Sequence, residues 1–245
     1  MVDVVFWISA LFAEIVGATA GFGSSTIFLP IALFFFEFRT ALILVAISHM
    51  SGSLGRIMFF RHGLDRGMLL TFGLPSVVFT LLGAFLVRFV SQPLLKLVLG
   101  VFLLAYAVIS FYRPNLSVEA STKNSVLGGS LSGFFAGLIG TGGALRGAFL
   151  SSFRLEKSVY VATAAAISLA VDITRIPVYL GSGFLPSEYY DAVPFLFLTA
   201  IAGSLIGRRI VGRIPQESFR KFVLACIGLV ALKFLSDGLV VIFSL

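Results

Sequence analysis

Gly133-Phe-Phe-Ala-Gly137-Leu-Ile-Gly140-Thr-Gly142-Gly143-Ala-Leu-Arg146 is an apolar stretch that a cluster of glycines interrupts and an arginine follows. A similar stretch, Gly17-Ala-Thr-Ala-Gly21-Phe-Gly23-Ser-Ser-Thr-Ile-Phe-Leu-Pro30, lies near the N-terminus. Each glycine costs a helix about 1 kcal/mol relative to alanine, so such a cluster ends or breaks a helix. Within a bilayer, broken backbone is tolerated only where it is buried in protein or lines a watery cavity. Two such breaks in corresponding places of two half-chains indicate the binding site of a transporter.

The composition is that of a membrane protein. The chain has 245 residues, of which 58% are hydrophobic and 12% charged, and its mean hydropathy is +1.06. Apolar runs of about 20 residues, long enough to cross a bilayer as α-helices, recur from end to end. We therefore expect an all-α polytopic membrane protein in contact with the lipid bilayer. The net charge of +7 does not indicate nucleic acid, because the basic residues lie mostly in short loops, where they orient helices.

The chain reads as two homologous halves. Pro30 and Arg56 are as far apart in the sequence as Phe149 and Arg175. Each half has about four long apolar segments, and a glycine-rich turn breaks the first of them. The predicted parts are an N-terminal membrane repeat (1–112), a polar linker (113–124) and a C-terminal membrane repeat (125–245). The expected helices include a short one over Thr26–Phe36, one over Ser125–Ile139 and one over Ala192–Ile210.

The orientation of the halves leaves two alternatives open. If each broken segment crosses the membrane once, there are eight crossings and the halves are parallel. If each broken segment is a hairpin, there are ten crossings and the halves are inverted. The basic stretch 208–221 should be cytoplasmic and the acidic loop 181–191 external. The distribution of basic residues favours the inverted arrangement.

Three arginines are candidate ligands for an anion. Arg56 and Arg175 occupy equivalent positions in the two halves, and arginine within a membrane segment is a functional hypothesis by default. Arg146 follows the second break, where helix N–H groups and a guanidinium together favour an oxyanion. The alternatives are that Arg56 extends to the headgroups from a helix end, and that Asp172 neutralises Arg175 on the same helix face.

Small residues at the two breaks complete the candidate site. Hydroxyl groups would donate to a bound anion, and glycines would let the backbone approach it. Close helix packing is the alternative role of such residues in a membrane. The candidates are Ser24, Ser25, Thr141, Gly23, Gly142 and Gly143.

Glu14, His49 and Asp172 are candidates for proton coupling. Glu14 is a carboxylate in an otherwise apolar segment, and histidine titrates near neutral pH without help. A hydrogen-bonded structural role is the alternative for His49. We find no catalytic motif, no paired metal ligands and no nucleotide-binding loop, so we expect neither an enzyme nor a cofactor.

The glycine-rich segments resemble those of the TauE/SafE sulfite exporter family, also called TSUP. The resemblance is carried by Gly17–Pro30 and Gly133–Gly143 and extends to the two-half layout. Here the first turn is shortened to Gly23-Ser24-Ser25, and Phe149 stands where proline is frequent in the family. The resemblance implies transport of sulfite, a sulfonate or a similar small anion by a multi-pass protein of the bacterial inner membrane. From the two-half layout we expect export by alternating access. The alternatives are an uncoupled channel or facilitator, and a non-transporting subunit of a larger complex. A homo-oligomer stays open.

Overall fold

The computed structural model describes residues 4–20, 23–59, 63–113, 118–210, 224–225 and 227–237. Regular structure in these ranges is helical throughout, which confirms the all-α class. The elements are α1 (Val4–Ala20), α2 (Ser25–Ala32), α3 (Phe38–Phe59), α4 (Arg66–Met68), the π-helix η1 (Leu69–Gly73), α5 (Leu74–Leu86), the 3₁₀-helix η2 (Val87–Phe89), α6 (Gln92–Tyr112), α7 (Thr122–Ile139), α8 (Gly143–Ser151), α9 (Lys157–Gly181), the 3₁₀-helix η3 (Ser187–Tyr189) and α10 (Ala192–Ile210). Residues 224–225 and 227–237 are helical as well.

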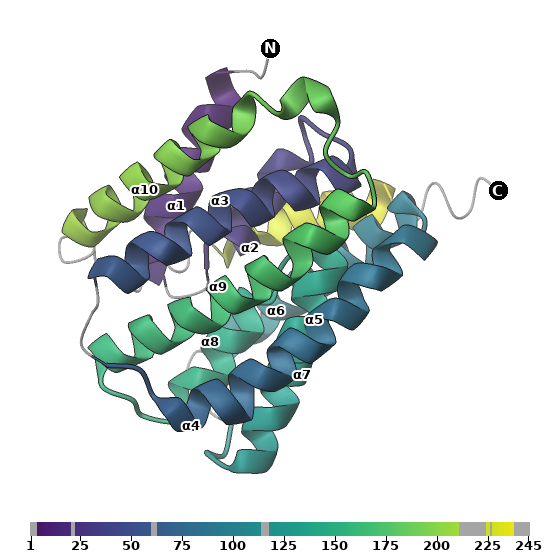
Figure 1. Ribbon diagram of the computed structural model, residues 1–245. Coiled ribbons are helices and arrows are strands. Elements are labelled where there is room, and N and C mark those ends of the chain that lie inside the picture. The colour runs from purple at the N-terminus through teal and green to yellow at the C-terminus, as the bar shows by residue number, and fades with distance from the viewer. Residues whose placement is uncertain are drawn as a thin grey trace.

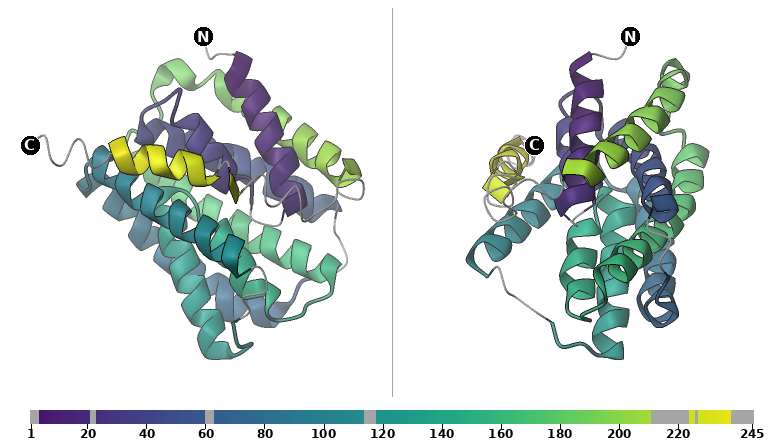
Figure 2. Two further views of the ribbon diagram at one scale, coloured as in Figure 1. Left: turned by 180° about the vertical axis from the view of Figure 1, so that it is seen from behind. Right: turned by 90° about the vertical axis from the view of Figure 1, so that its left-hand side faces the viewer.

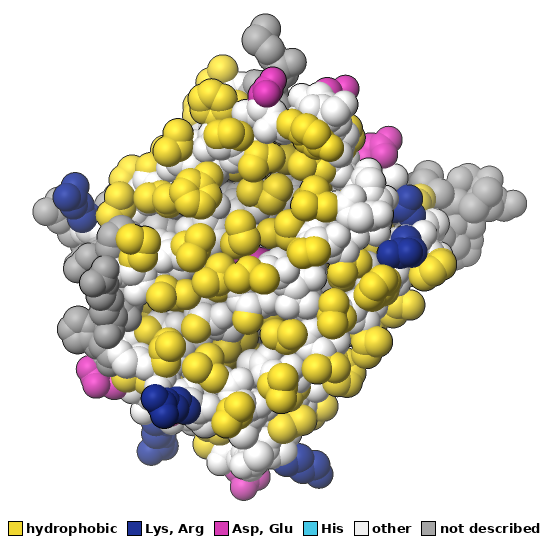
Figure 3. Space-filling model, viewed as in Figure 1, with side chains coloured by type: hydrophobic (Ala, Val, Ile, Leu, Met, Phe, Trp, Pro, Cys, Tyr) yellow, Lys and Arg dark blue, Asp and Glu magenta, His cyan; other side chains and the backbone are white. Residues whose placement is uncertain are grey.

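Length and surface chemistry agree with a multi-pass membrane protein. Four stretches of helix are long and apolar enough to cross a bilayer, namely Phe38–Met58, Arg66–Phe89, Gln92–Tyr112 and Ser158–Gly181. Hydrophobic side chains cover the visible face of the molecule, and most charged side chains gather towards its margins (Figure 3). A surface of this kind is suited to lipid. The number of crossings stays a prediction.

Both glycine-broken segments are helical hairpins. Gly17 of α1 lies so close to Ser24 that a Cβ at position 17 would collide with its backbone. In the second half, Gly142 approaches the backbone of Ser132, and Gly128 approaches the ring of Phe149. Contacts that pair later residues of α8 with earlier residues of α7 require α8 to run back along α7. Each break is therefore a reversal of the chain.

The two long helices that follow the hairpins run in opposite directions. Helices α3 and α9 follow the hairpins at equivalent places and lie side by side at the centre of the molecule (Figure 1). Arg39, near the start of α3, stacks on Phe184 beyond the end of α9, at 5.4 Å from the ring centroid. At the other end, the backbone N–H of Asp65 donates to Thr163. The antiparallel pair supports the inverted arrangement.

The first helix of each predicted half packs on a helix of the other. Helix α1 packs on α10 of the second half, and α7 packs on α5 of the first, while α3 and α9 lie between these two pairs (Figures 1 and 2). Each hairpin is therefore held by helices from both halves, which brings the two breaks together. The boundaries at residues 112 and 125 stay predictions.

Several predicted boundaries shift for local reasons. The helix expected over Thr26–Phe36 ends at Ala32, because the backbone N–H groups of Phe34 and Phe35 bond to i−3 carbonyls. The helix expected from Ser125 begins three residues earlier, where Ser121 caps it by accepting from the N–H of Asn124. The helix over Ala192–Ile210 has the predicted bounds. The basic stretch 208–221 lies outside the described residues beyond position 210.

Candidate functional site

The two glycine breaks meet inside the protein. The hydroxyl oxygens of Thr26, in α2, and Thr141, before α8, are 2.8 Å apart and buried. Gly23 and Gly140 adopt left-handed backbone conformations with φ of 78° and 74°, which other residues adopt only at a cost. These glycines let the chain reverse direction at each break, and the two reversals place Thr26 and Thr141 in contact.

The threonine contact predicts a measurable coupling. Thr26→Val and Thr141→Val should each lower the free energy of unfolding by about 1 kcal/mol, since each removes the same buried hydrogen bond. The double variant should lose less than the sum of the two single losses, because that hydrogen bond can be lost only once. Unfolding in detergent of the three variants and the parent measures this cycle. Strict additivity would contradict a hydrogen bond between the breaks.

Helix α7 ends at the second break, and side chains of α9 satisfy its final carbonyl groups. A helix leaves its last four carbonyls without partners. Here Nη1 of Arg175 donates to the carbonyl of Ala136 at 2.7 Å, and the hydroxyl of Tyr179 donates to that of Gly137 at 2.5 Å. A cation at this end also complements the helix dipole. Arg175 therefore acts as a cap of α7.

The carboxylate of Asp172 holds this cap in place. Its Oδ1 accepts from Nε of Arg175 at 3.0 Å and lies 2.7 Å from Nη2. Its Oδ2 is 2.7 Å from Nδ1 of His49, so the carboxylate joins α9 to α3. All three side chains are buried. One alternative from the sequence was that Asp172 pairs with Arg175, and the structure shows this ion pair.

A second buried carboxylate, Glu14, faces Arg56. The hydroxyl of Ser24 donates to Oε1 of Glu14. Oε2 lies 3.6 Å from Nη1 of Arg56, which is too long for a hydrogen bond. Both of these atoms are buried and have no hydrogen-bond partner among the described residues. Ser24 therefore holds Glu14 next to Arg56, but the carboxylate and the guanidinium do not form a hydrogen bond.

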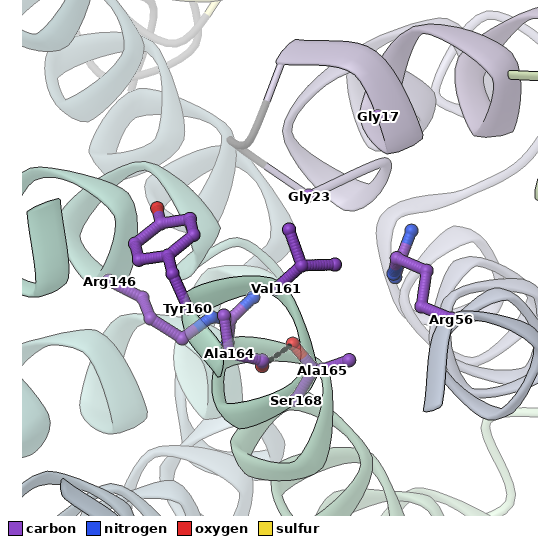
Figure 4. Close-up of a pocket in the computed structure, with 9 residues that line it drawn as sticks. All are labelled: Gly17, Gly23, Arg56, Arg146, Tyr160, Val161, Ala164, Ala165 and Ser168. Carbon is purple, nitrogen blue, oxygen red and sulfur yellow. Dashed lines mark hydrogen bonds between the residues drawn. The ribbon is translucent and has the colours of Figure 1, made fainter. Parts of the chain in front are cut away.

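A small cavity of about 50 Å³ opens beside these groups (Figure 4). Arg146 reaches it from α8 on one side, and Arg56 reaches it from α3 on the other. Gly23 lies against both Nε2 of His49 and Nη2 of Arg146, so any side chain at position 23 would crowd them. The cavity is lined by Gly17, Gly23, Arg56, Arg146, Tyr160, Val161, Ala164, Ala165 and Ser168.

The charges around this cavity favour an anion. Three buried or nearly buried arginines, Arg56, Arg146 and Arg175, face two carboxylates, so positive charge is in excess when His49 is neutral. Arg146 is only 6% exposed, and its guanidinium makes no hydrogen bond or ion pair with the described residues. A buried cation without a partner costs several kcal/mol, so it indicates a ligand or water at this place.

The structure separates the candidate residues into three groups. Gly23, Arg56 and Arg146 line the cavity. Glu14, Ser24 and His49 contact these lining residues or one another. The other candidates do not line the cavity, and they are Ser25, Thr141, Gly142, Gly143, Asp172 and Arg175.

Sequence reasoning missed the wall that α9 contributes. Tyr160, Ala164 and Ser168 are spaced by four residues, and Val161 and Ala165 repeat the interval, so all five share one helix face. Ser168 donates its hydroxyl hydrogen to the carbonyl of Ala164 at 2.8 Å. The run of small residues on one face was the available signal.

Two inverted helical hairpins that meet beside a charged cavity inside an apolar bundle define a membrane transporter. The comparisons agree, since the family model of the sulfite exporter TauE/SafE matches residues 6–234. The chain therefore belongs to the TauE/SafE family. It is also 26% identical to a probable membrane transporter protein of Methanocaldococcus jannaschii over 248 aligned positions, which cover 89% of this chain and 90% of that protein. No solved structure matches the chain.

Proposed function

We propose that this chain is a secondary transporter of a small anion, such as sulfite or an organosulfonate, which it exports across the bacterial inner membrane by alternating access. The observation that supports this proposal is that Arg146 and Arg56 face one small cavity from opposite sides. Nη1 of Arg56 has no hydrogen-bond partner among the described residues, and Arg146 is only 6% exposed. Guanidinium groups bind oxyanions with paired, charge-assisted hydrogen bonds.

The size of the cavity supports a small substrate. A volume of about 50 Å³ holds a few water molecules, since each needs about 10–15 Å³ measured with a water-sized probe. Val161, Ala164 and Ala165 form an apolar wall that would accept a short alkyl group. The hydroxyls of Tyr160 and Ser168 lie on the same wall. An oxyanion with no more than a short carbon chain fits this lining.

The inverted architecture supports alternating access. In transporters with inverted repeats, one repeat rocks against the other around a fixed central site. Here Arg56 comes from the first half and Arg146 from the second, so a bound anion would join both. Motion between the halves would open the cavity first to one side and then to the other.

Radiolabelled sulfite counterflow in proteoliposomes that contain only this protein tests the proposal. We expect saturable exchange that unlabelled sulfite or methanesulfonate reduces and that choline does not. Flux that rises linearly with concentration would indicate an uncoupled facilitator. A protein that exchanges neither sulfite nor any sulfonate would contradict the proposal, and stoichiometric copurification with a partner would then indicate a subunit.

A further inference from the structure

We propose that Glu14 and the transported anion compete for Arg56, so that each anion is carried together with a proton on Glu14. This inference rests on the proposed function and assigns its coupling ion. The inference is based on the ion pair between Nη1 of Arg56 and Oε2 of Glu14, which lie 3.6 Å apart beside the cavity and form no hydrogen bond. Neither atom has a hydrogen-bond partner among the described residues, although both are buried.

Arg56 is positioned to serve two partners. Its Nη2 donates to the hydroxyl of Ser53 at 3.0 Å, which holds the guanidinium between Glu14 and the cavity. The side chain is 11% exposed and lines the cavity, whereas that of Glu14 is fully buried and does not. An anion in the cavity would reach Arg56 from the open side. It would then compete with Glu14 for the guanidinium.

Glu14 cannot follow Arg56 towards the anion, because its side chain is closely packed against two glycines. A Cβ on Gly52 of α3 would collide with the carboxylate, and a Cβ on Gly203 of α10 would collide with the Cβ of Glu14. The hydroxyl of Ser24 holds the other carboxylate oxygen. Loss of Arg56 to an anion would therefore leave a buried carboxylate without a counter-charge, a state that protonation relieves.

Asp172, the other buried carboxylate near the breaks, is not suited to this role. Asp172 makes contacts of 3.0 Å and 2.7 Å with Arg175 and one of 2.7 Å with His49, and none of these three groups lines the cavity. The groups that act on Glu14 are Arg56 of α3, Ser24 beside α2 and, more remotely, Asp172 of α9. From α10, Gly203 and Ser204 bring no charge to the contact region. Glu14 is therefore the carboxylate whose cation an anion can take.

The proposed cycle conserves charge at the site. The anion enters and binds Arg56 and Arg146, and a proton from bulk solvent, relayed through cavity water, is transferred to Oε2 of Glu14. One negative and one positive charge arrive together, so the loaded site carries the same net charge as the empty site when the anion is monovalent. Because charge within a bilayer is costly, constant charge favours the change of access in both states. On the other side both ions leave in reverse order.

Linked binding makes two quantitative demands. By reciprocity, an anion that promotes protonation of Glu14 must itself bind more tightly when the pH is lower. The KM of the wild-type protein should therefore rise with pH. An anion gradient should also drive protons across the membrane in the same direction, one for each anion carried.

Proteoliposomes with an entrapped pH dye test both demands. Counterflow first shows whether sulfite or methanesulfonate is carried, and the carried anion is then applied as a gradient. Protein-free liposomes treated identically correct for passive movement of the protonated acid. We expect anion-driven acidification of the lumen in the wild type and its loss in Glu14→Gln, together with a KM that no longer depends on pH. Glu37→Gln is the matched control, because Glu37 is an exposed carboxylate that accepts from Gln92 outside the site.

The outcomes separate this inference from the proposed function. Failure of the wild type to exchange either anion contradicts the function itself. Exchange without proton movement, or a Glu14→Gln protein that still couples, overturns the inference and leaves the function standing. If Glu14→Gln exchanges nothing at any pH, the Ser24→Ala variant tests the inference instead. It removes only the hydroxyl that donates to Glu14 and must shift the pH profile of KM, and an unchanged profile overturns the inference.

Discussion

Replacement of Arg146 by glutamine is expected to lower kcat/KM for the transported anion by about 100-fold, since loss of one partner of a desolvated charge pair costs about 2–5 kcal/mol. Arg146 lines the cavity from α8, and no described residue neutralises it through an ion pair. Its loss should therefore act on the anion more than on the fold. Initial rates of sulfite counterflow over a range of concentrations measure the effect.

Two further arginine variants make this prediction specific. Arg88→Gln is the control, because Arg88 stacks on Phe85 and Phe89 at the end of a helix, far along the chain from the breaks. Arg146→Lys should retain part of the activity, since it keeps the charge and loses the paired geometry. Counterflow by Arg146→Gln with the kcat/KM of the parent protein would remove Arg146 from the site.

Replacement of Gly133 by alanine is expected to cost the folded protein about 3 kcal/mol or more, the upper part of the range for overpacking. Helices α5 and α7 touch backbone to backbone at this position, and a Cβ on Gly133 would collide with the carbonyl of Ser76. The contact also carries hydrogen bonds from Ser76 to the carbonyl of Gly129 and from Thr80 to that of Gly133, both 3.0 Å. The yield of monodisperse protein in detergent and its thermal midpoint measure the loss.

Gly181→Ala is the matched control for this substitution. Gly181 ends α9, and a Cβ there would meet no atom within 4 Å. It should leave the thermal midpoint unchanged or slightly raised, because alanine favours the helix. Equal midpoints for Gly133→Ala and Gly181→Ala would contradict the close contact of α5 with α7.

The sequence by itself determined the class of the protein and most of its helices. Apolar runs of bilayer length permit only helices there, because helices satisfy their own backbone hydrogen bonds. The glycine clusters located both breaks for the same local reason, since glycine weakens a helix wherever it occurs. The family resemblance, carried by those clusters, is confirmed by the match over residues 6–234.

Part of the candidate site was also accessible from the sequence. Arg56 and Arg146 are charges in apolar surroundings, which marks them without any knowledge of their neighbours. The spacing of Asp172 and Arg175 placed them on one helix face, and they are paired in the structure. Tyr160 and Ser168 carried no such mark, because a hydroxyl on a helix has many ordinary roles.

Only the tertiary structure decided which cation remains available to a ligand. Arg56 and Arg175 occupy equivalent positions in the sequence, yet Arg175 caps the carbonyl of Ala136 and Arg56 lies open beside the cavity. Their partners come from other helices and are distant in the chain, so no local pattern specifies them. The antiparallel pairing of α3 with α9 contributes to this choice, because Arg175 then meets the end of α7 while Arg56 meets Glu14 of α1.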